Sequence, residues 1–243
     1  MTLEQRIRQR FRAALVKYRL TEDGDKILVG LSGGKDSLCL LELMAAQARI
    51  HRPAITVEAL HVRMENISYE TDTRWLEDFC RQHGVRLHVR TTRFDAPTTG
   101  QTTKPVCFLC SWMRRKQLFE VAQELGFNKI ALGHHQDDII HTAMMNTFFQ
   151  GHFATMPARL QMRKMPLTII RPLCLEREAD LEVFARERHY QPQLKRCPNE
   201  RDTHRTTMRH VFEELEALNP EVRYSVWNAL ERDGRLVEDE QAP

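Results

Sequence analysis

Residues 32–37 have the types and the spacing of an anion-binding turn. They read Ser-Gly-Gly-Lys-Asp-Ser and stand between two apolar runs, which is the order strand, turn, helix start. Two adjacent glycines let the backbone fold tightly with no Cβ in the way, and the amides of such a turn point at one spot. Lys35 adds a positive charge. The expected ligand is therefore the phosphate chain of a nucleotide, contacted by Ser32, Gly33, Gly34, Lys35, Asp36 and Ser37.

Cys107 and Cys110 are spaced three residues apart at the start of a predicted helix. On a helix this spacing places both sulfurs on one face, and the cations of residues 114–116 favour the thiolate form that binds metals. Three readings follow from the residues. They are a [4Fe–4S] cluster held by a third cysteine, Cys197, a zinc site completed by Cys197 and His204, or a redox pair.

A third polar segment, residues 133–138, reads Gly-His-His-Gln-Asp-Asp. The carboxylates of Asp137 and Asp138 can hold a magnesium ion that bridges ATP phosphates, or can orient a substrate oxygen. Alternatively, they only favour the start of a helix. We expect catalytic roles for Lys35, Asp137 and Asp138, with magnesium on Asp137. The neighbouring histidines are candidates for a zinc site, for helix capping or for hydrogen bonding, and these are His134, His135 and His141.

Alternating apolar and amphipathic segments indicate how these residues are positioned. The apolar segments predicted as strands are 27–31, 56–62, 86–91, 129–132 and 167–171. The helices predicted to follow them begin near residue 36 and cover 69–83, 107–125, 136–149 and 176–189. This alternation predicts an α/β fold with a parallel five-stranded sheet and helices on both faces.

Ligands of parallel sheets bind beyond the carboxyl ends of the strands. Residues 32–37, 61–63 and 133–138 are therefore expected to meet in one cleft. We expect a single domain over residues 1–243, with an N-terminal helix within 1–20 and a C-terminal helical extension within 193–235. Further expected nucleotide contacts are His61, Arg63, Gly133 and Arg114.

Composition describes an ordinary globular chain. Of its 243 residues, 42% are hydrophobic and 28% charged, and no apolar run is long enough to span a bilayer. The N-terminus does not resemble a signal peptide, so a cytoplasmic location without membrane contact is expected. Three cysteines among apolar neighbours are expected in the core, and these are Cys39, Cys80 and Cys174.

Basic residues are concentrated in two stretches, 159–171 and 193–210, although the net charge is only +3. A one-sided basic surface suits nucleic acid, but solvated loops and helix faces produce such runs as well. The candidates for phosphate-backbone contact are Arg159, Arg163, Lys164, Lys195, Arg196 and Arg205.

The order of these motifs, followed by one late cysteine, resembles the tRNA 2-thiocytidine synthetase family of PP-loop ATP pyrophosphatases, which are adenine nucleotide alpha hydrolase-like. The resemblance covers residues 1–215 approximately. It implies an ATP- and Mg²⁺-dependent tRNA sulfurtransferase that adenylates the 2-oxygen of a cytidine, at nucleotide 32 of the anticodon loop, and replaces it with sulfur. It also implies a [4Fe–4S] cluster on Cys107, Cys110 and Cys197, a sulfur donor such as a cysteine desulfurase, and a homodimer.

The chain departs from that family at its late cysteine. Cys197 stands in Lys-Arg-Cys-Pro-Asn-Glu rather than in a Cys-rich segment ending near a glycine, which leaves the target nucleotide open. The terminal zinc fingers of the related 2-thiouridine synthetases are absent from the sequence. Two alternatives are a PP-loop tRNA-modifying ligase or amidotransferase with an amine nucleophile and a structural zinc site, and a nucleotide-binding regulatory or RNA-binding module.

Overall fold

The computed structural model describes residues 1–65, 72–93, 106–191 and 204–239. Its contacts group the chain into two compact units. The loop unit, residues 21–132 and 185–200, contains the glycine turn. The terminal unit, residues 1–20, 133–184 and 201–243, contains both ends of the chain. The single domain expected over residues 1–243 stays a prediction.

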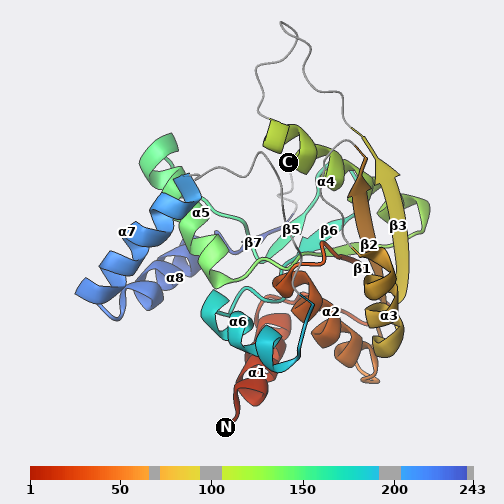
Figure 1. Cartoon of the computed structure of the whole chain (residues 1–243). Helices are drawn as coiled ribbons and strands as arrows, with labels where there is room; N and C mark the ends of the chain where they lie inside the picture. The colour runs from red at the N-terminus through yellow and green to blue at the C-terminus, as the bar shows by residue number, and fades with distance from the viewer. Residues whose placement is uncertain (66–71, 94–105, 192–203, 240–243) are drawn as a thin grey trace, which may run out of the picture. The chain divides into compact units, whose positions relative to one another are not determined.

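The loop unit is built on four parallel strands in the order β3-β2-β1-β4 (Figure 1). β1 (Lys26–Gly30) lies between β2 (Thr56–Met64) and β4 (Lys129–Ala131), and β2 pairs with β3 (Arg86–Thr92). The apolar side chains of β1 are fully buried, as expected for a parallel strand covered on both faces. The first four predicted strands are confirmed.

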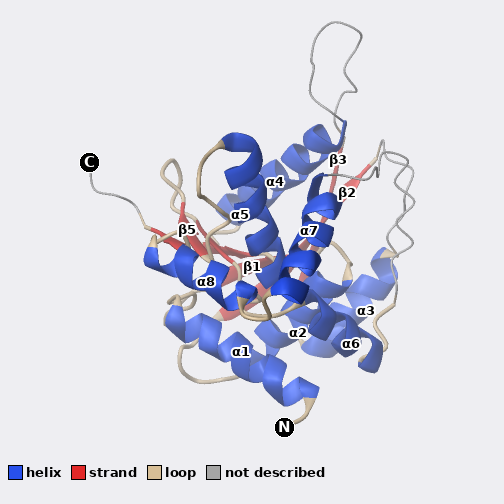
Figure 2. Cartoon of the chain, turned by 90° about the vertical axis from the view of Figure 1, so that its left-hand side faces the viewer, coloured by secondary structure: helices blue, strands red, loops and turns tan. Residues whose placement is uncertain are grey.

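Three helices pack on these strands, namely α2 (Lys35–Ala48), α3 (Thr73–His83) and α4 (Val106–Glu124). α2 contacts β1 and β2, and α4 contacts β2, β3 and β4. Figure 2 shows α4 on the other side of the strands from α2 and α3. Gly30 permits this packing, because a Cβ there would lie 3.1 Å from the Leu132 side chain and 3.5 Å from that of Leu118 on α4.

The start of α3 is set by a side chain. The Asp72 carboxylate accepts the backbone N–H of Trp75 at 3.1 Å and so caps the helix. The helix therefore begins at Thr73 rather than at 69, and residues 69–71 of the prediction lie outside the described part of the chain.

The terminal unit is mostly helical. Its helices are α1 (Leu3–Lys17), α5 (Gln136–Gln150), α7 (His204–Leu218) and α8 (Val222–Arg232), and α5 packs against α7 and α8. α6 (Glu178–Glu187) begins in this unit and ends in the loop unit. The predicted N-terminal helix and C-terminal helical extension are thus confirmed as α1 and as α7 with α8, whereas residues 193–203 of that extension lie outside the described chain.

The strand count differs from the expected five. The described residues contain seven strands, and the fifth predicted strand, 167–171, is β6 (Thr168–Ile170). β6 pairs antiparallel with β5 (Arg159–Gln161), which pairs parallel with β7 (Val237–Glu238). β5 and β7 are three and two residues long, too short to produce a periodic apolar signal in the sequence.

The end of α1 is fastened to α8. The Tyr18 hydroxyl donates to the Glu231 carboxylate at 2.6 Å and accepts from the Trp227 indole N–H at 3.2 Å, and Lys17 pairs with the same carboxylate.

Among the helices that the structure describes, none combines the length and the apolar character needed to cross a membrane.

Candidate active site

The glycine turn between β1 and α2 is held by its own serines. The Ser37 hydroxyl accepts the Gly33 N–H at 3.1 Å and donates to the Gly34 carbonyl at 2.9 Å. The Ser32 hydroxyl accepts the Gly34 N–H at 3.2 Å and lies 3.1 Å from that of Ser37. The two hydroxyls predicted to contact phosphate therefore stabilise the turn in this structure.

The backbone of the turn requires glycine at one position. Gly33 has φ +84°, a left-handed conformation that a side chain disfavours. Gly34 is the N-cap of α2, and no side-chain hydrogen bond caps the first turn of that helix, which is the place where a helix start binds an anion. Lys35 and Asp36 follow, 3.4 Å apart, with 29% of each side chain exposed.

His61 connects the turn to β2. Its Nδ1 lies 2.8 Å from the Leu31 carbonyl, and because a carbonyl can only accept, Nδ1 carries the proton and Nε2 is left as an acceptor. Burial lowers the pKa of His61, and the positive charges of Arg114 and Arg63 lower it further against the opposing effect of the Leu31 hydrogen bond. In the loop unit, the His61 imidazole is therefore neutral. It lies close to the start of the turn and to the charges of Arg63 and Arg114.

The cysteine pair begins α4. Cys107 is exposed, whereas 9% of Cys110 is exposed. The predicted third ligand, Cys197, lies outside the described residues, and the His204 side chain is likewise undescribed. Within the described chain no group of three or more His, Cys, Asp and Glu residues is placed to hold a metal. The core positions predicted for Cys39, Cys80 and Cys174 are confirmed, since each is at most 1% exposed.

Asp137, in the terminal unit, connects three helices. One carboxylate oxygen pairs with Arg223 of α8 at 2.8 Å, and the other accepts the N–H of Glu178, the first residue of α6, at 2.8 Å. Burial raises the pKa of Asp137, but His135, whose Nδ1 lies 3.6 Å from the carboxylate, and the Arg223 charge outweigh it and bring the pKa to about 2. The charged Asp137 side chain therefore joins α5 to α6 and α8, and its predicted magnesium role stays a prediction.

The other polar residues of segment 133–138 also have local partners. The Asp138 carboxylate accepts the His135 N–H at 3.1 Å at the start of α5. His134 Nδ1 accepts from the Arg171 guanidinium at 3.3 Å. Gly133, the first residue of the terminal unit, is half-buried. These contacts support the helix-start interpretation. The predicted meeting of this segment with the turn of the loop unit stays a prediction.

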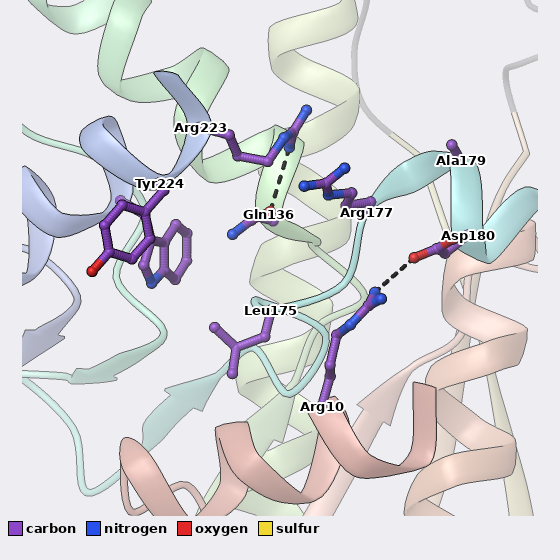
Figure 3. Close-up of a pocket in the computed structure, with 9 residues that line it drawn as sticks. Arg10, Gln136, Leu175, Arg177, Ala179, Asp180, Arg223 and Tyr224 are labelled. Carbon is purple, nitrogen blue, oxygen red and sulfur yellow. Dashed lines mark hydrogen bonds and ion pairs between the residues drawn. The ribbon is translucent and has the colours of Figure 1, made fainter. Parts of the chain in front are cut away.

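A pocket of about 520 Å³ lies beside Asp137 in the terminal unit (Figure 3). Figure 3 shows Tyr224 across the pocket from Arg177, with Leu175 and Arg10 on a third side. Arg10 pairs with Asp180 at 2.7 Å and lies 3.1 Å from the Glu176 carboxyl group, so its guanidinium already has two acidic partners. The residues that line the pocket are Arg10, Gln136, Leu175, Arg177, Ala179, Asp180, Arg223, Tyr224 and Trp227.

Sequence reasoning missed Arg223. It is 8% exposed and occupies the buried stripe of α8 together with Trp227 and Leu230. An arginine at an apolar stripe position is a signal, since such a cation needs a buried carboxylate partner. The sequence alone could not have identified Asp137 as that partner.

Three of the predicted phosphate-contact residues are placed by the structure in different settings. Arg159 donates to Asp239 at 2.7 and 2.8 Å, whereas Arg163 and Lys164 are exposed. Lys195 and Arg196 lie outside the described residues, and the Arg205 side chain is undescribed.

Residues 3–228 match a family described as the PP-loop domain. A tRNA-cytidine(32) 2-sulfurtransferase from Francisella tularensis subsp. novicida (strain U112) is 32% identical over 232 residues, covering 94% of this chain and 86% of that protein. One from Bordetella bronchiseptica is 33% identical over 95% of this chain and 72% of its own length. One from Geobacter metallireducens is 33% identical over 89% and 85%, respectively.

Two solved structures share the fold. A U34-tRNA thiolase, NcsA from Methanococcus maripaludis with its [4Fe–4S] cluster, superposes with TM-score 0.78 at 24% identity over 98% of this chain and 81% of that one. An NH3-dependent NAD synthetase from Campylobacter jejuni superposes with TM-score 0.53 at 11% identity over 100% of both chains. These likenesses confirm the α/β fold with a mostly parallel sheet.

Proposed function

Because the chain belongs to the family of PP-loop tRNA-cytidine(32) 2-sulfurtransferases, we propose that it uses ATP to replace the 2-oxygen of a tRNA cytidine with sulfur. The proposed cytidine is nucleotide 32, the position in the relatives' name. The observation that carries the proposal is the turn Ser32–Ser37, with Gly33 at φ +84° and an uncapped helix start behind it. Such a turn binds phosphate groups through backbone amides.

The proposed reaction has two steps. The cytidine 2-oxygen attacks the α-phosphate of ATP and pyrophosphate leaves, which converts a poor leaving group into a phosphate ester. Sulfide then attacks C2 and AMP leaves. In this proposal the backbone amides at the start of α2 and the Lys35 side chain hold the phosphates and stabilise the charge that develops on them. Magnesium would screen that charge when bound.

A neutral His61 offers a bound nucleotide a hydrogen-bond acceptor, which a protonated His61 would not. Its Nδ1 donates to the Leu31 carbonyl, directly before the turn, so its Nε2 is an acceptor that can receive a hydrogen bond from an amino or hydroxyl group of the bound nucleotide. Arg63 and Arg114 contribute the positive charge of this site, and both lie close enough to His61 to lower its pKa.

Cys107, Cys110 and Cys197 are the proposed ligands of a [4Fe–4S] cluster, which would supply the bound sulfur. The donor set fits such a group, because two thiols three residues apart at the start of α4 share one face. The proposed partners are tRNA, a sulfur donor such as a cysteine desulfurase, and a second copy of the chain. Light scattering on the purified protein tests the homodimer.

The test begins with protein purified without oxygen. Iron, zinc and acid-labile sulfide are measured, and the protein is incubated with ATP, Mg²⁺, sulfide and an unmodified tRNA transcript before the nucleosides are analysed by mass spectrometry. About four irons and four sulfides per chain and formation of 2-thiocytidine are expected. Zinc without iron, together with a new amine-containing nucleoside, would replace this proposal with the amine-transfer alternative.

Two variants separate the ligands from core thiols. Cys110→Ala is expected to lose iron and thiolation, whereas Cys80→Ala keeps both. Cys80 is the matched control because it is 1% exposed and burial raises its pKa to about 12, so its thiol stays protonated. Equal iron content in the two variants would overturn the assignment of Cys110.

A further inference from the structure

The outward face of α4 carries two large aromatic side chains next to the cysteine pair in the sequence. Phe108 is 48% exposed and Trp112 is 50% exposed. They stand four residues apart, so their rings lie on neighbouring turns of one helix face. An aromatic pair left half in water is unusual for a helix that otherwise packs on β2, β3 and β4.

Cations border this aromatic pair. Lys116 Nζ lies 5.8 Å from the centroid of the Trp112 ring, a cation–π distance, and Arg115 is exposed one residue before it. From residue 106 to 119 the sequence contains Arg114, Arg115 and Lys116 and no acid, and Lys116 also pairs with Glu120 at 3.5 Å. We call the exposed set Phe108, Trp112, Arg115 and Lys116 the α4 face.

We propose that the α4 face is a stacking platform for unpaired bases of the RNA substrate, with Arg115 and Lys116 contacting the phosphates between them. This inference rests on the proposed tRNA substrate and names residues that touch it. The complementarity is specific, since single-stranded RNA presents flat bases for stacking and one negative charge per nucleotide, whereas duplex RNA hides its bases.

The position of the platform also fits the proposed chemistry. Phe108 follows the exposed Cys107 directly and precedes Cys110 by two residues. A base held on Phe108 and Trp112 would place its neighbour in the loop beside the cysteine pair. An apolar protein partner is disfavoured, because apart from Phe108 the exposed residues next to Trp112 on this helix are Ser111, Arg115 and Lys116, which are polar or charged.

The test measures binding of a dye-labelled RNA hairpin, containing the anticodon stem and loop, by fluorescence anisotropy. Trp112→Leu is expected to weaken binding about 5- to 140-fold, the range for removing one base–aromatic stack. Trp112→Phe is expected to restore most of the affinity, since it keeps a ring. Phe148→Leu is the matched control, because Phe148 is a 62% exposed phenylalanine on α5 of the terminal unit.

Salt and structure dependence give two further readouts. Arg115→Ala is expected to reduce the slope of log K against log salt by about 0.7 for each single-strand phosphate that the arginine no longer neutralises. An RNA duplex without the loop is expected to compete poorly for the wild-type protein.

Several outcomes would overturn the platform. They are wild-type affinity in Trp112→Leu, equal weakness of Trp112→Phe and Trp112→Leu, or loss of thiolation in Trp112→Leu with unchanged RNA affinity, which would indicate a protein partner. Failure of the proposed function is separate from these. In that case the wild-type protein itself forms no 2-thiocytidine, whatever the variants bind.

Discussion

Replacing Asp137 with asparagine removes one negative charge and preserves the shape of the side chain. The structure assigns that charge to the ion pair with Arg223 at 2.8 Å, in a residue that is 9% exposed. The pKa of Asp137 falls from 3.8 to about 2. At 1.36 kcal/mol per pKa unit, the charged form stabilises the fold by roughly 2–3 kcal/mol at neutral pH. Asp137→Asn should lose that amount, and Arg223→Ala, which leaves a buried carboxylate unpaired, about 3–5 kcal/mol.

Urea unfolding followed by circular dichroism and by tryptophan fluorescence provides the assay. Because the folded pKa is depressed, the stabilisation by Asp137 is complete above pH about 4 and is lost as the pH falls through about 2. The stability difference between wild type and Asp137→Asn should therefore shrink over that interval. Asp138→Asn is the control, since its carboxylate accepts one backbone N–H, and it should cost about 1 kcal/mol.

One result would refute this reasoning. If Asp137→Asn unfolds at the wild-type urea concentration but no longer thiolates tRNA, Asp137 acts on the substrate or on magnesium instead of joining α5 to α6 and α8. A double-mutant cycle sharpens the outcome. The reasoning requires a coupling energy near 2 kcal/mol between Asp137 and Arg223, well above the values measured for exposed pairs.

Three further predictions concern other parts of the chain. Gly33→Ala should weaken ATP binding in calorimetry, because a side chain at φ +84° costs about 1–2 kcal/mol and distorts the turn. Gly126→Ala, at φ +71° with open space around it, should bind ATP normally. Equal ATP affinities of the two variants would contradict the role of the turn. Burial raises the pKa of Glu176 to about 8 against the opposing Arg10 charge. The wild type should therefore lose stability as the pH rises from about 5 through about 8, whereas Glu176→Gln should not. The same change in melting temperature between these pH values in both proteins would refute this. Tyr18→Phe removes the donor to Glu231 and should cost about 1.5–3 kcal/mol in thermal unfolding, and an unchanged melting temperature would show that α1 is held by other contacts.

The Asp137 contacts also bear on how the terminal unit is organised. The segment 133–138 leads into α5, and the Asp137 carboxylate in it accepts the first N–H of α6 and pairs with the buried Arg223 of α8. A change at this residue therefore reaches three helices and one wall of the pocket in Figure 3, which Gln136 and Arg223 both line. If an Asp137 variant loses activity, its stability must also be measured, because unfolding and loss of a catalytic group would both reduce the activity.

Local patterns were enough to predict the elements around the turn. The apolar run 27–31 became β1, and the residues that follow it became a turn with Gly33 at positive φ, because strand burial and turn geometry depend on nearest neighbours in the chain. The spacing of Cys107 and Cys110 likewise predicted that they lie near each other at the start of one helix. The short strands β5 and β7 escaped prediction, since two or three residues carry no period.

Tertiary structure decided the partners of the polar residues. The sequence offered Asp137 as a magnesium ligand or as a helix starter, and only the fold brings Arg223 to it. The protonated nitrogen of His61 follows from the Leu31 carbonyl, directly after the neighbouring strand β1. A charge or a hydrogen bond depends on distance in space, and residues far apart in the chain come within 3 Å only when their elements pack. Residue types therefore predicted the chemistry available, and packing determined which groups use it.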